Sequence, residues 1–462
     1  MAGSGVETTP IDGLLVVRLA VHGDARGWFK ENWQRERMVA AGLPDFGPVQ
    51  NNVAHNTSRG ATRGIHAEPW DKLVSVAAGR VFAAWVDLRE GQGFGTTFTL
   101  EIDESVAVYV PRGVGNSYQA LEDGTAYSYL VNEHWDTGAS YPGLDPGDED
   151  LGIEWPIPLA EAELSAKDRA NPRLRDLQPL PRRVLVIGAH GQLGKALLAA
   201  FPGADGVDLD ELDLTDPAAV AGWRWARYDD VLNAAAYTAV DAAEQERVAA
   251  WAANATGPAL LARAARTHGF TLVHYSTDYV FDGSRPEHRE DEPVSPLGVY
   301  GQSKAAGDLA VAGVPRHYLL RTSWVVGDGH NFVRTMLRLA RDGVSPSVVA
   351  DQVGRLTFVD ELARATRHLL SRAAAYGTYH VTNGGDPMSW AEVAEEVFAL
   401  ADRERGDVTR VSTEQYAGGR SLAPRPPDGT LALDRIRATG FDPADAREAL
   451  RAYVARELAA DA

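Results

Sequence analysis

The sequence predicts two domains of different fold class, an all-β antiparallel barrel or jelly roll followed by an α/β domain with a doubly wound parallel sheet. Three observations support this prediction. At 462 residues the chain is too long for one ordinary core. Short apolar runs separated by glycine-containing turns occupy the first third. After Val184, buried strands alternate with helices. We expect the domains at 1–168 and 183–462, joined by a proline-containing linker at 169–182.

The first domain is expected to consist of short antiparallel strands. Six apolar or alternating runs predict strands at residues 14–19, 73–76, 81–88, 98–102, 106–110 and 127–131. Glycine-containing turns separate these runs, which is typical of a barrel or jelly roll.

The second domain opens with a fully buried strand at 184–187, followed by a glycine turn and an Ala/Leu-rich helix. A strand at 229–234, a helix at 249–268 and a strand at 271–276 follow. This alternation predicts a doubly wound parallel sheet with helices on both faces.

The composition excludes several classes of protein. The net charge of −19 disfavours binding to the phosphate backbone of nucleic acids, so we expect no nucleic-acid partner. The chain has no cysteine, which excludes disulfides, thiol catalysis and cysteine-bound zinc. No apolar run has the length of a membrane span, and the N-terminus lacks the pattern of a signal peptide. We therefore expect a cytoplasmic protein without a membrane partner.

The glycine turn predicts a dinucleotide site. Gly188, Gly191 and Gly194 follow a strand and open a helix, which lets a pyrophosphate approach the helix N-terminus. The alternative is a turn needed only for helix–sheet packing. Asp208 ends the next strand, where a carboxylate suits a ribose diol and repels a 2′-phosphate. Because its neighbour Leu209 is not a base, NADH is favoured over NADPH.

Tyr300 and Lys304 form the second signal in this half. Residues four apart lie on one face of a helix. We expect the ammonium to lower the pKa of the phenol, so that the phenol can exchange a proton near neutral pH. Combined with the glycine turn, this pair indicates a nicotinamide-dependent oxidoreductase.

Residues 183–460 resemble the dTDP-4-dehydrorhamnose reductase family of extended short-chain dehydrogenases, which implies a Rossmann sheet with a small substrate-binding lobe. The matching segments are Gly188–Gly194, Asp213–Leu214, Asn233–Asp241, His274–Gly283, Pro296–Lys304, Arg321–Trp324, Asn331–Phe332, Asp351–Gly354 and Arg425–Pro426.

This resemblance implies catalytic, substrate-binding and cofactor-binding roles for particular residues. Thr277, Tyr300 and Lys304 would be catalytic, and Asp278, Trp324 and Arg425 would bind the substrate. The cofactor would contact Gly188, Gly191, Gln192, Leu193, Gly194, Asp208, Asp213, Leu214, Ala236, Thr238, Tyr300 and Lys304. The alternative for Asp213 and Leu214 is an aspartate at a helix start beside a core leucine. The chain departs from the family at Tyr237, Leu356 and Gly429, where the family often has His, Pro and Ser.

The first domain resembles the dTDP-4-dehydrorhamnose 3,5-epimerase family, a cupin-like jelly roll, over residues 10–178. The matching segments are Gly23–Phe29, Val49–Asn52, Arg63–Lys72, Trp85–Arg89, Val110–Gly113, Tyr127–Tyr129 and Leu164–Asp168. The alternatives are a structural histidine at position 66 and a core aromatic at position 129.

The epimerase resemblance implies proton abstraction next to a ketone. His66 would be the base, oriented by Asp168; Lys72 would stabilise the enolate oxygen, and Tyr129 would return a proton on the opposite face. The substrate would be held by Arg26, Glu31, Gln50, Asn52, Arg63 and Asn116. Departures from many members occur at Ala83, Asn116, His134 and Trp135, so inversion at C3, at C5 or at both carbons stays open.

Together, the two resemblances predict a bifunctional enzyme that epimerises dTDP-4-keto-6-deoxy-D-glucose and reduces the product to dTDP-L-rhamnose. The expected cofactor is NADH or NADPH, magnesium is a possible further requirement without an identifiable ligand cluster, and a homodimer is expected. The alternatives are a reductase with an inactive or single-carbon epimerase domain, and a nucleotide-sensing regulatory protein.

Overall fold

The chain folds into two compact units in a computed structural model that describes residues 5–134 and 141–460. The units are Met1–Arg182 with Thr267–Gly269, and Arg183–Arg266 with Phe270–Ala462. Trp135 lies outside the described residues. Within those residues, no helix combines the length and the apolar character needed to cross a membrane.

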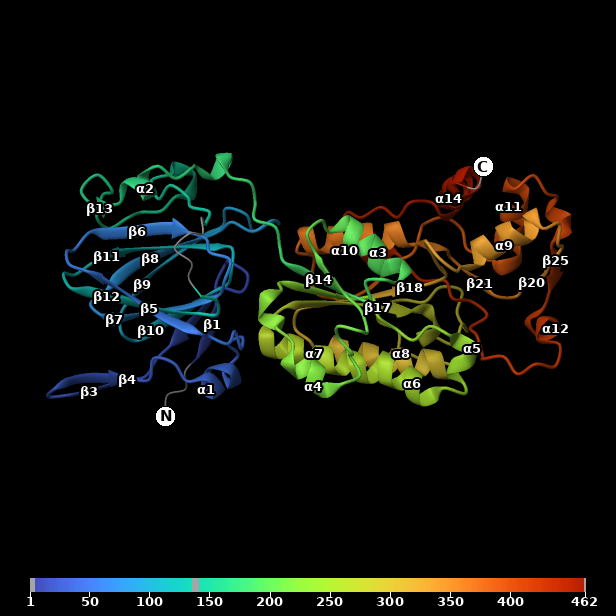
Figure 1. Cartoon of the computed structure of the whole chain (residues 1–462), viewed down its shortest axis with the longest axis horizontal. Helices are drawn as coiled ribbons and strands as arrows, with labels where there is room; N and C mark the ends of the chain where they lie inside the picture. The colour runs from blue at the N-terminus through green and yellow to red at the C-terminus, as the bar shows by residue number, and fades with distance from the viewer. Residues whose placement is uncertain (1–4, 135–140, 461–462) are drawn as a thin grey trace. The chain divides into compact units, whose positions relative to one another are not determined.

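Two mainly antiparallel sheets build the first unit (Figure 1). The six-stranded sheet has the order β1-β2-β10-β7-β12-β5, with bounds Val6–Thr8, Leu15–Arg18, Val106–Val110, Lys72–Ala78, Thr125–Val131 and Gln50–Asn56. The five-stranded sheet has the order β13-β6-β11-β8-β9, with bounds Glu163–Leu164, Ala61–His66, Val114–Ala120, Val81–Asp87 and Thr97–Ile102. Val76 and Trp85, one from each sheet, pack in a shared core. The expected jelly roll is confirmed.

The remaining elements of this unit are short. They are the hairpin β3 (Val21–Asp24) and β4 (Gly27–Lys30), the helices α1 (Arg35–Ala40) and α2 (Ala166–Arg169), and two 3₁₀ turns at Glu149–Leu151 and Leu174–Asp176. The segment expected to be a linker follows α2, and Leu180 within it forms backbone hydrogen bonds with Leu88 and Glu90.

The six strands expected in this unit are all present, with ends that differ by at most two residues. The strands β5, β6 and β11 were not expected, because their sequences are not apolar enough to predict a strand. They carry polar residues such as Asn56, Arg63 and Asn116, which line a cavity rather than the core. The polarity that hid these strands is therefore part of the candidate site.

The second unit contains six parallel strands in the order β15-β14-β16-β17-β18-β23. Their bounds are Asp205–Val207, Val184–Ile187, Asp230–Asn233, Thr271–Thr277, His317–Thr322 and Gly377–His380. The helices α3 (Gln192–Ala200) and α10 (Val359–Ser371) cover one face, and α4 (Pro217–Gly222), α7 (Gly257–His268) and α8 (Val299–Ala312) cover the other (Figure 1). The doubly wound sheet is confirmed.

The helix expected at 249–268 is interrupted. It consists of α6 (Arg247–Trp251), a π-helical turn at Ala252–Thr256, and α7. The turn places the buried Asn254 so that its amide accepts from Tyr237 N at 2.9 Å and donates to Tyr237 O at 2.9 Å. A π-turn inside an α-helix is frequently found at a functional site. Here it fixes the segment that carries Ala236 and Thr238.

A smaller lobe completes this unit (Figure 1). Its core joins α9 (Phe332–Arg341), α11 (Trp390–Leu400) and α14 (Ala446–Ala460). Two further helices, α5 (Val240–Ala243) and α13 (Asp434–Ala438), pack beside the parallel sheet and its helices rather than in the lobe. The other elements of the unit are α12 (Thr413–Ala417), β19 (Val325–Val326) paired with β22 (Thr357–Phe358), β20 (Ser347–Val349) paired with β25 (Thr409–Val411), and β21 (Val353–Gly354) paired with β24 (Met388–Ser389).

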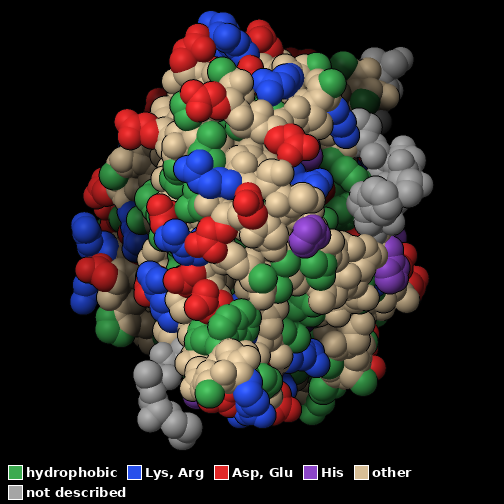
Figure 2. Space-filling view, turned by 90° about the vertical axis from the view of Figure 1, so that its left-hand side faces the viewer, with side chains coloured by type: hydrophobic (Ala, Val, Ile, Leu, Met, Phe, Trp, Pro, Cys, Tyr) green, Lys and Arg blue, Asp and Glu red, His purple; other side chains and the backbone are tan. Residues whose placement is uncertain are grey.

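Charged side chains of both signs are interspersed on the face of the molecule shown in Figure 2. On this face the negative net charge of the chain is not gathered into one patch.

Candidate active sites

A cavity of about 630 Å³ in the first unit is lined by residues from both sheets and from α2. It brings together the four residues expected to be catalytic, His66, Lys72, Tyr129 and Asp168, together with Arg63. A pocket of this size with convergent polar groups is typical of a small-molecule site.

His66 and Asp168 are in direct contact. His66 Nε2 lies 2.7 Å from Asp168 Oδ1, and the Ser165 hydroxyl accepts a hydrogen bond from Asp168 N at 3.0 Å. Burial raises the pKa of Asp168, but hydrogen bonds from His66 and Ser165 outweigh this effect and leave the pKa below its ordinary value. The carboxylate is therefore charged and orients the imidazole, whose Nδ1 is left for a substrate.

Lys72 forms an ion pair with Glu68, and its side chain is only 5% exposed. Tyr129 is half-buried, and its pKa is raised by burial and then by the negative charge of Glu68. The phenol therefore stays protonated near neutral pH and is able to donate. Glu68 was not identified from the sequence, although its position four residues before Lys72 was a usable signal.

The expected substrate residues fall into two groups. Asn116 lies in the cavity, where its Oδ1 accepts from Trp85 Nε1 at 2.9 Å and from the Tyr127 hydroxyl at 3.2 Å. Gln50 and Asn52 share the β5 face of the cavity-lining Asn56, because side chains two apart in a strand point to the same side.

Arg26 and Glu31 do not line this cavity. Arg26 is exposed and pairs with Asp24 at 2.5 Å, and Glu31 pairs with Arg37 at 3.1 Å. In the described residues of this chain, the cavity is completed instead by Tyr118 and Tyr127, whose rings stack with centroids 4.0 Å apart.

The second unit contains a cavity of about 710 Å³ at the carboxyl ends of its parallel strands. This is where doubly wound sheets bind ligands. The cavity is lined by Gly191, Gln192, Leu193, Gly194, Ala236, Thr238, Thr277, Asp278, Tyr300, Lys304 and Trp324. Eleven of the residues expected in this half therefore share one cavity.

The glycine turn forms one end of the cavity. Gly188 has a φ of +80°, and a Cβ on Gly194 would lie 2.8 Å from the Ala189 Cα. Gly191 precedes α3 without a side-chain cap, so the first N–H groups of the helix are left for a ligand. Positive partial charge and unpaired N–H groups suit a pyrophosphate, so the turn fits a dinucleotide.

Thr277, Asp278 and Tyr300 form the polar centre. Thr277 Oγ1 donates to Asp278 Oδ1 at 2.9 Å, and Asp278 Oδ2 is buried without a hydrogen-bond partner. Burial raises the pKa of Asp278 to about 7. The expected lowering of the Tyr300 pKa is wrong for this structure, because burial and then the charge of Asp278 raise it. A raised pKa keeps the phenol protonated, as a proton donor requires.

Lys304 lies one helical turn after Tyr300 in α8. It is buried and donates from Nζ to Tyr275 O at 2.7 Å. Burial lowers its pKa to about 8, against the opposing charge of Asp308. The ammonium is therefore still the main form at neutral pH, close to its titration range.

Two tryptophans form the wall on the lobe side. Trp324 and Trp390 stack with centroids 3.6 Å apart, and both line the cavity. Trp324 has a φ of +44°, which is unusual for a large side chain. Trp390 was not identified from the sequence, because 66 positions separate it from Trp324 and neither periodicity nor spacing links them.

Five expected residues do not line this cavity: Gly188, Asp208, Asp213, Leu214 and Arg425. Asp208 accepts from His190 N at 3.0 Å, next to the glycine turn, and Arg425 pairs with Asp241 at 2.8 Å. Asp213 accepts from Thr215 N at 2.8 Å, and Leu214 is buried in the core. Leu214 is thus a core leucine, as in the alternative, whereas Asp213 does not start a helix, because Asp216 is the N-cap residue of α4.

Gly429, where the related family often has Ser, lies against the centre of the site. A Cβ at this position would meet Asp278 Oδ2 at less than a normal contact distance. Among the described residues, no group of three or more His, Cys, Asp or Glu side chains is arranged to hold a metal ion.

The folds and sites define a two-domain enzyme. A jelly roll with a site suited to acid–base catalysis is joined to an oxidoreductase of the short-chain dehydrogenase type. Residues 182–459 match the family described as "RmlD substrate binding domain", and residues 8–176 match "dTDP-4-dehydrorhamnose 3,5-epimerase". The chain belongs to the first family through its second unit and to the other through its first unit.

Relatives of each half support this assignment. The "Protein RmlC homolog" of Streptococcus pyogenes serotype M6 is 47% identical over 38% of this chain and 91% of its own length. The "Probable dTDP-4,6-dihydroxy-2-methyloxan-3-one 4-ketoreductase" of Streptomyces antibioticus is 40% identical over 60% of this chain and 97% of its own length. The crystal structure of dTDP-4-dehydrorhamnose reductase from Bacillus anthracis in complex with NADP is 36% identical, with a TM-score of 0.56, and covers 60% of this chain and 100% of that one.

Proposed function

We propose that the chain catalyses two consecutive reactions on a dTDP-4-keto-6-deoxy sugar. The first unit inverts C3 and C5, and the second reduces the C4 ketone to give dTDP-L-rhamnose. The observation that carries this proposal is that the residues predicted to be catalytic line one cavity in each unit. They are His66, Lys72, Tyr129 and Asp168 in the first unit and Thr277, Tyr300 and Lys304 in the second.

In the epimerase cavity, His66 removes a proton from the carbon next to the ketone. The Asp168 carboxylate holds Nε2, so Nδ1 is the basic atom that takes the proton. The Lys72 ammonium stabilises the enolate oxygen. Tyr129, which is protonated, returns a proton on the opposite face.

In this unit, the residues expected to bind the substrate hold its nucleotide and diphosphate. Arg63 pairs with the diphosphate, for which a guanidinium is suited by its two parallel N–H groups. Asn116, Gln50 and Asn52 bind from the cavity and its β5 rim. Substrate binding by Arg26 and Glu31 stays a prediction. Both residues are exposed and lie outside the cavity in this structure.

In the reductase cavity, the nicotinamide group supplies a hydride to C4 when it is bound. Gly188, Gly191 and Gly194 cradle the pyrophosphate at the start of α3, with Gln192, Leu193, Ala236 and Thr238 along the cavity wall. Asp208 lies beside this turn, where its charge favours a ribose diol, so NADH is preferred to NADPH. Binding of the cofactor at Asp213 and Leu214 is not supported by their placement.

The side chains at the centre complete the reduction. Thr277 donates to the ketone oxygen, Tyr300 transfers its proton to that oxygen, and Lys304 holds a ribose hydroxyl. Asp278 and Trp324 face the sugar. Substrate binding by Arg425 stays a prediction; its guanidinium pairs with Asp241 and does not line the cavity.

The test separates the two reactions in one chain. Tyr300→Phe is expected to abolish cofactor oxidation and to retain deuterium exchange at C3 and C5, whereas His66→Ala is expected to lose exchange. Mixing the two variants should restore the reduced product. Failure of the mixture, with both variants folded, would contradict the proposal.

A second candidate is reduction to another dTDP-6-deoxysugar after inversion at a single carbon. It is favoured by the similarity to the Streptomyces antibioticus protein, whose name is not that of a rhamnose enzyme. Deuterium at only one of the two carbons would support it. Cytoplasmic location, a homodimer and a magnesium requirement stay predictions from the sequence.

A further inference from the structure

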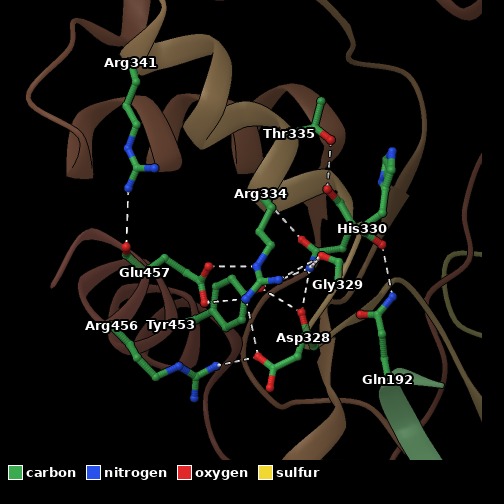
Figure 3. Close-up of polar contacts among 12 residues, drawn as sticks. Gln192, Asp328, Gly329, His330, Arg334, Thr335, Arg341, Tyr453, Arg456 and Glu457 are labelled. Carbon is green, nitrogen blue, oxygen red and sulfur yellow. Dashed lines mark hydrogen bonds and ion pairs between the residues drawn. The ribbon is translucent and has the colours of Figure 1, made fainter. Parts of the chain in front are cut away.

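The wall of the reductase cavity that faces the glycine turn is formed by the loop 327–331, which follows β19. Asp328 and Gly329 line the cavity. Gln192, at the start of α3, donates from Nε2 to His330 O at 3.0 Å, as Figure 3 shows. The glycine turn and this loop are therefore in direct contact, and the position of the loop sets the width of the cavity at its nucleotide end.

Two buried side chains fix the start of this loop through one carbonyl group. Gly327 O accepts from Asn331 Nδ2 at 2.7 Å and from the Tyr453 hydroxyl at 2.8 Å. Asn331 is 7% exposed and Tyr453 is 4% exposed. Asn331 also caps α9 by accepting from Arg334 N at 2.9 Å. The loop is thus tied to α9 and, through Tyr453, to α14.

An ion pair between the same two helices holds the rest of the loop (Figure 3). Arg334 of α9 pairs with Glu457 of α14 in a bidentate arrangement, with distances of 2.7 and 3.0 Å. The same guanidinium donates to Gly329 O at 3.3 Å and to Asp328 Oδ1 at 3.4 Å. A planar guanidinium held by two parallel bonds has a defined direction, so Glu457 orients the group that grips the loop.

We propose that Tyr453, Arg334 and Glu457 are positioning residues for the cofactor. None of the three lines the cavity, so their effect passes through the loop 327–331. In this arrangement the C-terminal helix of the substrate lobe sets the nucleotide end of the cavity, and the packing of the lobe and the affinity for the dinucleotide are coupled. The inference rests on the proposed function, since it takes the ligand of this cavity to be a nicotinamide dinucleotide.

The chain offers a matched control. Arg410 and Glu395 form a second bidentate pair in the same lobe, with distances of 2.6 and 2.7 Å, and neither residue contacts the loop. Glu457→Gln and Glu395→Gln therefore remove the same kind of bond from the same lobe. Tyr453→Phe removes only a hydroxyl.

The experiment measures the Kd of NADH and NADPH by fluorescence, kcat and KM for reduction, and hydrogen exchange of the loop amides without nucleotide. Glu457→Gln and Tyr453→Phe are expected to raise Kd and KM about three- to tenfold, to leave kcat within about twofold, and to speed exchange in the loop. Glu395→Gln should match the wild type in all three, and exchange of substrate protons by the epimerase unit should be unchanged in every variant.

Suppose that the wild type binds the nucleotide and that both test variants show an unchanged Kd and unchanged loop exchange. That result would overturn this inference and leave the proposed function standing. So would an equal rise in Kd in Glu457→Gln and Glu395→Gln, because that result would show general loosening of the lobe. Absence of nucleotide binding by the wild-type protein would overturn the proposed function as well.

Discussion

His274 Nε2 lies 3.5 Å from Lys304 Nζ, and both groups are buried. The backbone N–H of Ala235 donates to Asn233 Oδ1 at 3.2 Å, which fixes the orientation of this amide. Asn233 Nδ2 therefore donates to His274 Nδ1, 3.0 Å away, and the imidazole proton is left on Nε2. An N–H group facing Lys304 disfavours the ammonium, in the same direction as its burial.

The first prediction concerns the alkaline limit of ketone reduction. Lys304 is charged below its pKa of about 8 and loses its charge above it, so kcat/KM is expected to fall as the pH rises through about 8. Asn233→Asp lets His274 donate from Nδ1 and accept at Nε2, which favours the ammonium. The fall should then occur at higher pH, as measured by initial rates of cofactor oxidation. If kcat/KM of a folded Asn233→Asp variant still falls at the wild-type pH, this account is contradicted.

A second transition is expected from Asp278. Its carboxyl group, with a pKa raised by burial to about 7, is neutral below that pH and negative above it. The negative form raises the pKa of Tyr300 and makes the phenol a weaker proton donor, so reduction should slow as the pH rises through about 7. Asp278→Asn is expected to remove this transition and to retain the one at Lys304. Persistence of both transitions in the variant would rule out the assignment.

The third prediction concerns Gly429, where a serine is expected to lower the pKa of Asp278. In Gly429→Ser, the new Cβ forces the Asp278 carboxylate to turn, and the hydroxyl is able to donate to the otherwise unpaired Oδ2. A hydrogen bond to the charged form lowers the pKa of an acid, so the lower transition should move below pH 7. Gly406→Ser is the control, because a Cβ there meets nothing within 4 Å. Equal profiles for the two variants would refute this prediction.

The epimerase unit yields a prediction that leaves the reductase untouched. Asp168→Asn keeps the shape of the side chain but removes the charge that orients His66. We expect deuterium exchange at C3 and C5 to slow about 10²-fold, the lower end of general-base effects. Reduction of a ketone that is already epimerised should proceed at the wild-type rate. Exchange at the wild-type rate in this variant would exclude the His66–Asp168 pair as the base.

The residues predicted to be catalytic come together in the structure more completely than the residues predicted to surround them. The glycine turn, Tyr300 and Lys304 follow local rules of spacing, and the structure brings them into one cavity. Leu214 was misplaced in the cofactor wall, because neighbouring residues in a loop do not reveal which of them turns into the core.

Other features depend on contacts between distant residues. The tautomer of His274 is set by Asn233, 41 residues earlier, and the loop 327–331 is held by Tyr453, more than 120 residues later. No periodicity or motif encodes such pairs, so they appear only once the fold is known. The polar strands β5, β6 and β11 were missed for a related reason, since their residues serve a cavity instead of a core.

The most direct test of the central proposal is one incubation of the wild-type chain in D₂O with dTDP-4-keto-6-deoxyglucose and either NADH or NADPH, followed by NMR of the product. We predict cofactor oxidation, deuterium at both C3 and C5, and a product with the L-rhamno configuration. Absence of oxidation with both cofactors, or a reduced product without deuterium at C3 and C5, would contradict it.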